Sequence, residues 1–497
     1  MMLSPAGEQA APMPLAQLLQ SERADLQGAV VAGMQLDSRR VAPGDLFLAM
    51  PGDVHDGRHY IEQAVANGAA AVLAEAPVAG FVDALHVPLV EIPELRYEAG
   101  VLASRFHGYP SRHMHVVGIT GTNGKTTTSR IFAQLARALG RPCGVIGTLG
   151  CTLGDDVSDA GNTTPDPLAL QRQLADWRAQ GVPAVSMEVS SHALVQGRVN
   201  GVEFETAIFT NLSHDHLDYH DSMSSYARAK MRLFAAEGLR HAVINVDDDL
   251  AALIAAGVGE GVQILTYSAS GAGADIRVVD PRFHSGGVHA TLCSPWGEGE
   301  FDSPLPGDFN LSNLTAAVAA LVLAGEDLLA VLQAAGQLHP VAGRMQSIPN
   351  SAGLQVIVDY AHTPHALEQV IAALRPHVDG ALITVFGCGG DRDRQKRQLM
   401  GRVACELSDH VVVTSDNPRG EDPLAIMADI ESGCSGAYSM EADRAQAILA
   451  AVTGASPGDC VLIAGKGHEN YQLVDGEKQH FSDEDQARRA LARRAAL

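Results

Sequence analysis

The sequence reads Val116-Val117-Gly118-Ile119-Thr120-Gly121-Thr122-Asn123-Gly124-Lys125-Thr126-Thr127 where an apolar run leads into a glycine-rich turn. Glycines in such a turn let backbone N–H groups surround phosphate oxygens, the lysine brings a cation to the outer phosphates, and the next hydroxyl can ligate Mg²⁺. The general motif has glycine where this chain has Ile119, so the loop is a variant. We therefore predict an ATP- or GTP-binding loop formed by Gly121, Thr122, Asn123, Gly124, Lys125, Thr126 and Thr127.

The bulk composition restricts the class of protein. The chain has 497 residues, too many for one core, and its 46% hydrophobic and 19% charged residues are typical of globular proteins. Its net charge of −23 disfavours nucleic acid and anionic membrane surfaces as partners. The N-terminus has no signal-peptide pattern, and there is no long apolar run. We expect a cytoplasmic protein, monomeric, without a membrane partner. Seven cysteines lack a CxxC pair, which predicts neither a zinc site nor disulfides.

Turn-rich segments predict three α/β domains, at 1–110, 111–338 and 339–497. Gly108 to Ser111 separates the first from the second, and Leu338 to Gly343 separates the second from the third. In the middle region apolar strands alternate with helical segments, an order that predicts a parallel sheet with helices on both faces. The third region repeats this alternation.

Polar side chains follow two apolar strands of the middle region. The strand at 182–189 ends in Glu188, and a carboxylate at the carboxyl end of a parallel strand lies beside the phosphate loop, where Mg²⁺ commonly binds. Glu188 is the first metal candidate, with a purely structural carboxylate as the alternative. The next strand leads into a stretch rich in possible ligands, where spacing does not separate His214 from His216. By pattern alone, Lys230 is an ordinary lysine of an amphipathic helix.

Together these segments resemble the ATP-dependent muramyl ligases of bacterial cell-wall synthesis, a family of three-domain amide-forming enzymes, over nearly the whole chain. The resemblance implies a uridine-nucleotide-binding N-terminal domain, a P-loop ATPase-like central domain and a Rossmann-like C-terminal domain that binds the amino acid. It implies that Lys230 is carbamylated, which converts a cation into an oxygen ligand for a second Mg²⁺. The implied catalytic residues are Lys125, Glu188, His216 and Lys230. The implied metal ligands are Thr126, Glu188, His216 and Lys230.

Three further segments resemble the same family: Asn310-Leu311-Ser312-Asn313, Gly343-Arg344-Met345 and Asp359-Tyr360-Ala361-His362-Thr363-Pro364. In relatives the second asparagine, the arginine and the aspartate contact ATP, which implies the same for Asn313, Arg344 and Asp359. An amide can hydrogen-bond an adenine edge, a guanidinium can neutralise phosphate, and a carboxylate can accept ribose hydroxyls. Without the resemblance, Asn313 would be interpreted as a helix cap.

The segment Asp416-Asn417-Pro418-Arg419 resembles the amino-acid recognition motif of family members that add meso-diaminopimelate. This amino acid differs from lysine by a distal carboxylate, for which a guanidinium offers paired donors. Arg419 is therefore the expected selector, and Glu469 could take the distal ammonium. Sequence chemistry alone also allows an Asx-Pro turn. The expected amino-acid contacts are Arg392, Asp416, Asn417, Pro418, Arg419, Gly465 and Glu469.

The N-terminal segments Leu36-Asp37-Ser38-Arg39 and Gly52-Asp53-Val54-His55-Asp56-Gly57 resemble the uridine-nucleotide site of the family. Leu36 and Ser38 are the matched contacts, and the loop from Asp53 to His55 is a weaker match. The implied substrate is UDP-N-acetylmuramoyl-L-alanyl-D-glutamate. Its peptide end is expected to meet Asn162, Thr163, Thr164, Ser190, Gln196 and Arg198, a set of amides, hydroxyls and one guanidinium suited to carboxylate and lactyl groups.

The reaction implied by the resemblance is ATP-dependent amide formation through an acyl phosphate, with meso-diaminopimelate as the acceptor. Lysine-adding relatives and folate-type glutamate ligases are the alternatives among enzymes. The motif at Asp416 to Arg419 argues against the first, and the uridine-nucleotide segment argues against the second. A nucleotide-dependent switch or motor would also have a phosphate loop, but it would not need an amino-acid pocket.

Overall fold

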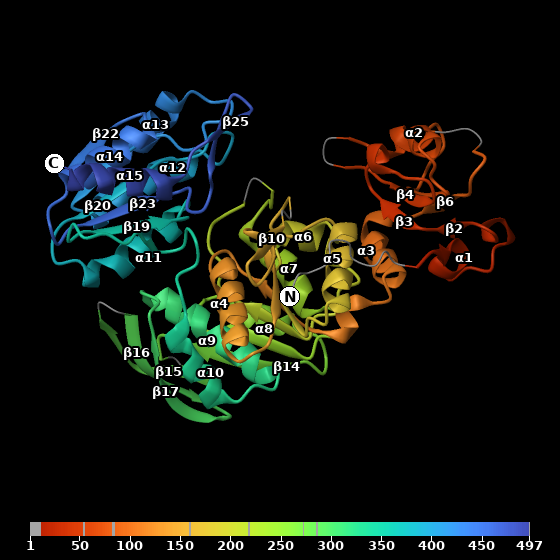
Figure 1. Cartoon of the computed structure of the whole chain (residues 1–497), viewed down its shortest axis with the longest axis horizontal. Coiled ribbons are helices and arrows are strands. Elements are labelled where there is room, and N and C mark those ends of the chain that lie inside the picture. Colours follow the sequence, from red (N-terminus) through yellow and green to blue (C-terminus); the bar gives the residue numbers. More distant parts are fainter. Residues whose placement is uncertain are drawn as a thin grey trace.

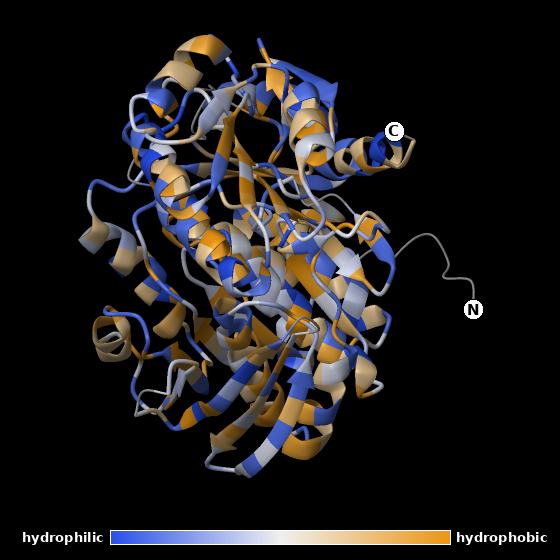
Figure 2. Ribbon diagram, turned by 90° about the vertical axis from the view of Figure 1, so that its left-hand side faces the viewer, coloured by the Kyte–Doolittle hydropathy of each residue, from blue (hydrophilic) through white to orange (hydrophobic). Residues whose placement is uncertain are grey.

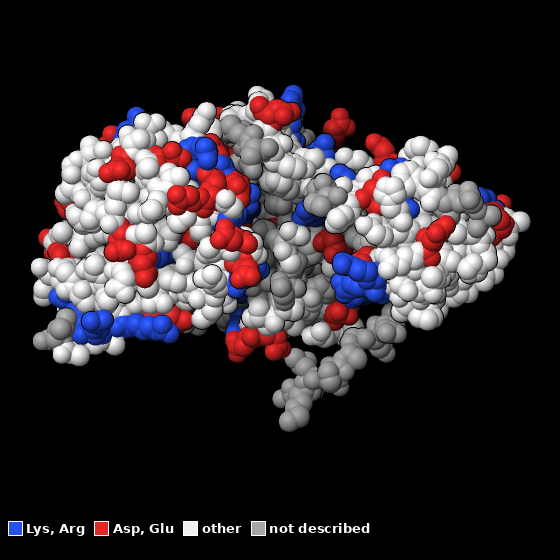
Figure 3. All heavy atoms as spheres, turned by 90° about the horizontal axis from the view of Figure 1, so that it is seen from above, with Lys and Arg blue, Asp and Glu red and all other residues white. Residues whose placement is uncertain are grey.

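A computed structural model describes residues 11–52, 55–81, 85–158, 161–216, 219–271, 273–284 and 287–496 of the chain. Three large sheets follow one another along the chain, each with its own helices, and two two-stranded sheets, β1-β2 and β24-β25, accompany them. The structure is therefore an α/β protein of three domains (Figure 1). Within the described residues, no helix is long and apolar enough to cross a bilayer. Acidic and basic side chains are interspersed on the face seen from above (Figure 3).

The first domain has a four-stranded parallel sheet in the order β3-β4-β5-β6. Every residue of β4 is buried, because the core lies on both faces of this strand. Its elements are β1 (Met13–Pro14), α1 (Leu15–Leu18), β2 (Val30–Val31), β3 (Gly33–Gln35), β4 (Asp45–Ala49), α2 (Ile61–Ala66), β5 (Ala71–Glu75), β6 (Leu89–Ile92) and α3 (Leu95–Phe106).

The second domain has an eleven-stranded sheet in the order β10-β9-β8-β11-β7-β12-β13-β14-β15-β16-β17. The strands from β8 to β15 in this order are parallel, as the alternation predicts, whereas β9, β10, β16 and β17 join the two edges antiparallel. The expected parallel sheet is therefore confirmed, and it forms the centre of a larger mixed sheet. Hairpins extend it at both edges, since antiparallel strands need no helical crossover.

Helices cover both faces of this sheet, as the alternation predicts. Successive residues of a strand point to opposite faces. Accordingly, Val117 packs in the cluster that contains α4 and α9, whereas Val116 packs with α5, α7 and α8 on the other face. Figure 2 shows strands rich in apolar residues among helices of mixed hydropathy.

The elements of the second domain are β7 (His115–Thr120), α4 (Lys125–Ala138), β8 (Cys143–Gly147), β9 (Gly150–Leu153), β10 (Asp156–Ser158), α5 (Pro167–Ala179), β11 (Ala184–Glu188), α6 (Ser191–Val195), β12 (Thr206–Phe209), α7 (Met223–Phe234), β13 (His241–Asn245), α8 (Ala251–Ala256), β14 (Gln263–Ser268), β15 (Ile276–His284), β16 (Gly287–Ser294), β17 (Gly297–Ser303), α9 (Asp308–Leu323) and α10 (Leu328–Ala334).

The third domain has a six-stranded sheet in the order β18-β19-β23-β20-β21-β22, parallel except for β18. Two buried clusters lie on its two faces. Its elements are β18 (Gln346–Ser347), β19 (Gln355–Asp359), α11 (Pro364–Leu374), β20 (Leu382–Phe386), α12 (Gln395–Leu407), β21 (His410–Val413), α13 (Pro423–Glu431), β22 (Tyr438–Met440), α14 (Arg444–Gly454), β23 (Cys460–Ala464), β24 (Tyr471–Val474), β25 (Glu477–His480) and α15 (Asp483–Ala495).

Three strand ends converge at one edge of the central sheet. The last residue of β11, Glu188, pairs with Ile119 of β7, and the last residue of β12, Phe209, pairs with Thr120. The carboxyl ends of parallel strands form the place where α/β sheets bind ligands. The register therefore places Glu188 directly beside the phosphate loop.

Candidate active site

The phosphate loop lies between the end of β7 and the start of α4. Gly124 immediately precedes the helix and has a left-handed φ of +86°. A Cβ on Gly124 would collide with Oδ1 of Asn313, which belongs to α9. Only glycine satisfies both the conformation and this close approach. The helix N-terminus thus presents its free N–H groups at the mouth of the loop, as phosphate binding requires.

Lys125 is folded over its own loop. Its Nζ donates hydrogen bonds of 2.8 Å to the carbonyl oxygens of Gly121 and of Thr122. Burial lowers the pKa of Lys125, and the nearby Glu188 carboxylate opposes this shift. The lysine therefore lies where a phosphate group on the loop would meet it.

Oxygen donors gather beside the loop. Thr126 donates its hydroxyl to Oε2 of Glu188 at 2.8 Å, and Glu188 is almost completely buried. Thr148, which follows β8, donates its backbone N–H to Oε1 of Glu188 at 2.8 Å and its hydroxyl to Oε2 at 3.1 Å. Carboxylate and hydroxyl oxygens are the ligands that Mg²⁺ prefers, so this pair fits the expected ion. In the described part of the chain, no three His, Cys, Asp or Glu side chains form a metal-binding group. A metal here would therefore also need hydroxyl or phosphate oxygens.

Lys230 points into the protein rather than to solvent. It lies on α7, is 1% exposed, and its Nζ donates a 2.7 Å hydrogen bond to the carbonyl oxygen of Gly121. The same Nζ lies 4.4 Å from the ring centroid of Tyr226. Burial, together with the nearby Lys125, lowers the pKa of Lys230 well below its ordinary value. The interpretation of Lys230 as an ordinary amphipathic-helix lysine is wrong.

The structure distinguishes the two histidines that spacing left open. His216 lines the same cleft as the loop, with a positive φ of +54° and Nε2 at 3.4 Å from Oδ2 of Asp215. Partial burial, assisted by the charges of Lys125 and Lys230, lowers the pKa of His216 to about 4 although Asp215 opposes the shift. A neutral imidazole can act as a metal ligand. Both histidines are exposed, but His214 is not among the described residues that line the cleft. Leu217 and Asp218 of this stretch lie outside the described residues.

Residues from α9 and from the third domain complete the cleft around the loop. Asn313 accepts a 3.1 Å hydrogen bond from the hydroxyl of Thr128 in α4. Arg344 donates from Nη2 to the Thr126 hydroxyl at 3.3 Å. Its guanidinium lies over the ring of Tyr360, with 4.3 Å between Cζ and the ring centroid. These contacts bring the third domain against the phosphate loop.

Asp359 ends β19 at the same cleft and is 6% exposed. Its two oxygens accept backbone N–H groups of Met345 and Ala361, each at 2.7 Å. Burial raises the pKa of Asp359, whereas Arg344 and these hydrogen bonds oppose the rise. Each oxygen keeps a second lone pair that can accept a ribose hydroxyl.

The cleft has a volume of about 690 Å³ and also contains the peptide-side candidates. Thr164 donates its hydroxyl to the carbonyl oxygen of Glu188 at 3.0 Å, and Arg198 donates to the carbonyl oxygen of Thr164 at 3.0 Å. The sequence-predicted residues that line this cleft are Thr122, Asn123, Gly124, Lys125, Thr126, Thr127, Asn162, Thr163, Thr164, Glu188, Ser190, Arg198, His216, Lys230, Asn313, Arg344 and Asp359.

A second cavity of about 460 Å³ lies between the first and second domains and holds the uridine-side candidates Leu36 and Ser38. Gln196 also lines this second cavity rather than the cleft, while Arg198 lines both. Ser38 donates its hydroxyl to Oε1 of Gln63 at 2.8 Å. Asp53 and Val54 of the weaker match lie outside the described residues, and His55 lines the cavity.

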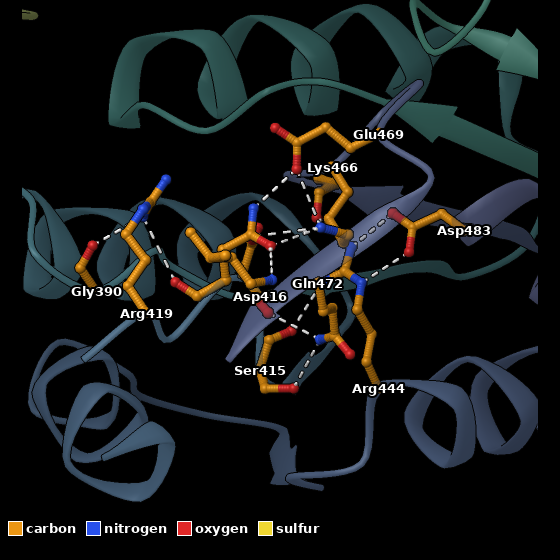
Figure 4. Close-up of polar contacts among 12 residues, drawn as sticks. Gly390, Ser415, Asp416, Arg419, Arg444, Lys466, Glu469, Gln472 and Asp483 are labelled. Carbon is orange, nitrogen blue, oxygen red and sulfur yellow. Dashed lines mark hydrogen bonds and ion pairs between the residues drawn. The ribbon is translucent and has the colours of Figure 1, made fainter. Parts of the chain in front are cut away.

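The amino-acid candidates form a separate group at the carboxyl ends of β21 and β23 (Figure 4). Arg419 has a left-handed φ of +54°, and its backbone N–H bonds to the carbonyl oxygen of Leu473 at 2.9 Å. Its Nη1 donates to the carbonyl oxygen of Gly390 at 2.8 Å. Asn417 donates from Nδ2 to Oε2 of Glu469 at 2.8 Å. The described residues that line the two cavities include none of these candidates: Asp416, Asn417, Pro418, Arg419, Gly465 and Glu469. Arg392 is exposed.

Two residues were missed in the sequence analysis, Thr148 beside the phosphate loop and Lys466 among the amino-acid candidates. Thr148 follows a strand end, so the rule that identified Glu188 could also have found it. Lys466 belongs to the matched Gly465–Glu469 segment but had no expected role, because nothing in its sequence shows that the side chain is buried. Cys388, which follows β20, is buried, and burial raises the pKa of its thiol to about 12.

Three family descriptions match consecutive parts of the chain. "Mur ligase family, catalytic domain" matches residues 30–107, "Mur ligase middle domain" matches 119–321, and "Mur ligase, glutamate ligase domain" matches 343–467.

Curated relatives match almost the full length. The UDP-N-acetylmuramoyl-L-alanyl-D-glutamate--2,6-diaminopimelate ligase of Pseudomonas aeruginosa is 48% identical over 97% of this chain and 98% of its own length. The enzyme of the same name from Ectopseudomonas mendocina is 47% identical over the same shares. A solved structure with that name is 38% identical and superposes with a TM-score of 0.74, covering 98% of this chain and 100% of its own. The chain therefore belongs to the Mur ligase family.

Proposed function

We propose that this protein is an ATP-dependent ligase that adds meso-diaminopimelate to UDP-N-acetylmuramoyl-L-alanyl-D-glutamate in peptidoglycan precursor synthesis. The observation behind the proposal is the cleft of about 690 Å³, in which the phosphate loop faces the peptide-side residues Asn162, Thr164 and Arg198. Such an arrangement suits transfer of a phosphoryl group to a peptide carboxylate. The names of relatives that are 45–48% identical support the same reaction.

The first step forms an acyl phosphate. The terminal D-glutamyl carboxylate attacks the γ-phosphorus of ATP, the bond to the β-phosphate oxygen breaks, and ADP leaves. The loop N–H groups, Lys125 and Arg344 stabilise the charge on the transferring group. Mg²⁺, held by Thr126, Glu188 and His216, would neutralise phosphate charge when bound.

The second step forms the amide. The amine of meso-diaminopimelate attacks the acyl carbon, phosphate leaves, and the amine loses a proton. No protein nucleophile takes part. Because the amino-acid residues and the loop belong to different domains, we propose that closure of the third domain brings the amine to the acyl phosphate. We propose domain boundaries after residues 110 and 338.

We further propose that Lys230 is carbamylated. Carbamate formation joins the uncharged amine to CO₂ and releases a proton, so it requires an amine that is neutral near pH 7. The lowered pKa of Lys230, which follows from its burial beside Lys125, favours this reaction. The resulting anionic oxygens would be suited to ligate a second Mg²⁺ beside the phosphate loop.

We propose that Arg419 and Glu469 determine which amino acid the enzyme accepts. Meso-diaminopimelate carries a distal carboxylate and a distal ammonium, and these residues offer one charge of each complementary sign. ATP, UDP-N-acetylmuramoyl-L-alanyl-D-glutamate and meso-diaminopimelate are thus the proposed ligands. A cytoplasmic location and a monomeric state are also proposed, and cell fractionation and light scattering test them.

The decisive assay is phosphate release from Mg²⁺-ATP with UDP-N-acetylmuramoyl-L-alanyl-D-glutamate, comparing meso-diaminopimelate with L-lysine. We expect release only when both the nucleotide-sugar peptide and meso-diaminopimelate are present. A preference for lysine would refute the role of Arg419 but keep the ligase. Release that ignores both acceptors would refute the ligase.

A further inference from the structure

Lys466 lies beneath the amino-acid residues on a backbone that has little freedom. Its flanking glycines have positive φ values, +116° at Gly465 and +52° at Gly467. A Cβ on Gly465 would lie 2.7 Å from Oδ2 of Asp416, and a Cβ on Gly467 would lie 2.7 Å from the carbonyl oxygen of Gly343. Close packing on both sides therefore fixes the direction of the Lys466 side chain, which is 0% exposed.

The buried ammonium has a defined set of partners. Nζ of Lys466 donates to Oδ1 of Asn417 at 3.1 Å and to Oε2 of Glu469 at 3.0 Å, and it lies 3.9 Å from Oδ1 of Asp416. Burying an ammonium is costly unless carboxylates and hydrogen bonds compensate for the lost water. Here the compensating groups are three of the residues expected to bind the amino acid.

Asn417 closes the network into a ring. Its Oδ1 accepts both the Lys466 ammonium and the backbone N–H of Leu473, the latter at 2.9 Å. Two donors on one oxygen fix the orientation of the amide, because its nitrogen cannot take that place. The amide nitrogen therefore points to Oε2 of Glu469, which it reaches at 2.8 Å.

Glu469 is consequently held by one of its two oxygens. Oε2 receives the hydrogen bonds of both Lys466 and Asn417, and neither donor contacts Oε1 (Figure 4). The side chain keeps 18% of its surface exposed, whereas Lys466 is fully enclosed. The geometry thus leaves one carboxylate oxygen with a fixed direction and room to accept a further donor.

We propose that Lys466 is a positioning residue for the acceptor amino acid: it holds Oε2 of Glu469 so that Oε1 receives the distal ammonium of the acceptor. The role rests on the proposed function. Lys466 also offsets one of the two negative charges of Asp416 and Glu469. Without it, the Glu469 carboxylate loses a charged donor and its fixed direction.

The test compares two acceptors in steady-state phosphate release by the full chain. L-2-aminopimelate keeps the reacting amine and both carboxylates of meso-diaminopimelate but lacks the distal ammonium. The Lys466→Met variant is expected to raise KM for meso-diaminopimelate about tenfold or more, as for loss of a charged hydrogen bond. The KM values for ATP and for L-2-aminopimelate, and kcat, should each change less than about threefold.

Lys478→Met is the matched control. Lys478 is an exposed lysine of the neighbouring hairpin β24–β25, and its Nζ lies 4.5 Å from the ring centroid of Tyr471 rather than against the Glu469 carboxylate, so the variant should behave as wild type. An equal rise of KM for both acceptors after Lys466→Met would overturn the proposal. Wild-type protein that ligates neither acceptor would instead overturn the proposed function.

Glu469→Gln provides a second test if Lys466→Met does not fold, as judged by circular dichroism. In the Glu469→Gln background, Lys466→Arg should change KM for meso-diaminopimelate less than about threefold, because the ion pair between Lys466 and Glu469 is then already absent. A further rise of about tenfold in that background would show that Lys466 does not act through Glu469.

Discussion

Replacing Arg444 with methionine is expected to destabilise the third domain far more than the same replacement of Arg488. Both arginines donate two hydrogen bonds to a carboxylate of α15. Arg444 reaches Asp483 at 2.7 Å twice, and Arg488 reaches Glu484 at 3.0 and 2.7 Å. The side chains of the first pair are both 0% exposed, whereas those of the second pair are 49% and 34% exposed. The two ion pairs are therefore alike in their hydrogen bonds but differ in burial.

The magnitude follows from what each substitution leaves behind. Arg444→Met leaves the Asp483 carboxylate buried without its cation, a loss of about 3–5 kcal/mol in the free energy of unfolding. It also removes the donor for the carbonyl oxygens of Ser415 and Ala464, which Arg444 reaches at 3.1 and 2.9 Å. Arg488→Met leaves a solvated carboxylate, so we expect a loss of about 0–1 kcal/mol.

Hydrogen exchange followed by mass spectrometry is the suitable assay. Fluorescence would not report on the third domain, since the two tryptophans of the chain, Trp177 and Trp296, lie in the second. A loss of 3–5 kcal/mol corresponds to roughly a hundredfold to several thousandfold faster exchange in peptides from β23. Less than about tenfold acceleration in Arg444→Met, or equal acceleration in Arg488→Met, would refute the argument from burial.

Three further substitutions test the site. Lys230→Ala should lower phosphate release about a hundredfold or more, and bicarbonate or short carboxylates should restore part of it; no recovery would contradict the carbamate. Arg419→Lys should raise KM for meso-diaminopimelate about tenfold without changing KM for ATP, because an ammonium lacks paired donors; an unchanged KM for the amino acid would reject the selector role. Gly124→Ala should weaken ATP binding in calorimetry about tenfold or more, since its Cβ meets Asn313. Gly140→Ala is the control, because φ is also positive there (+78°) but a Cβ would meet open space. It should cost about 1 kcal/mol of stability and leave the ATP affinity unchanged. Equal ATP affinities of Gly124→Ala and Gly140→Ala would exclude the steric argument.

The parts of the site that follow strand ends could be predicted from the sequence. A parallel sheet aligns the carboxyl ends of its strands, so an apolar run followed by Glu188 predicts a carboxylate beside the loop. The observed pairing of Glu188 with Ile119 follows this rule. The strand expected at 182–189 is observed as Ala184–Glu188.

Contacts between distant elements could not be predicted in this way. Lys230 meets Gly121 across 109 residues of chain, and Arg344 meets Thr126 across 218. An amphipathic pattern shows which face of a helix is apolar, but it does not show that a lysine on this helix is buried against a loop carbonyl. The burial of Lys466 has the same cause, since Asp416 and Asn417, which lie about it, are distant in the chain. The antiparallel edges of the central sheet were missed because the expectation rested on strand and helix alternation.

Arg198 has a consequence for ligand design, because it lines both the 690 Å³ cleft and the 460 Å³ cavity. The two spaces adjoin at this side chain, so two weakly binding fragments, one in each space, could be joined by a short tether that passes Arg198. Once the first fragment is bound, the tether holds the second at a millimolar effective concentration. A linked compound of this kind would gain affinity without new contacts. The tether would need to be only long enough to pass the side chain of Arg198.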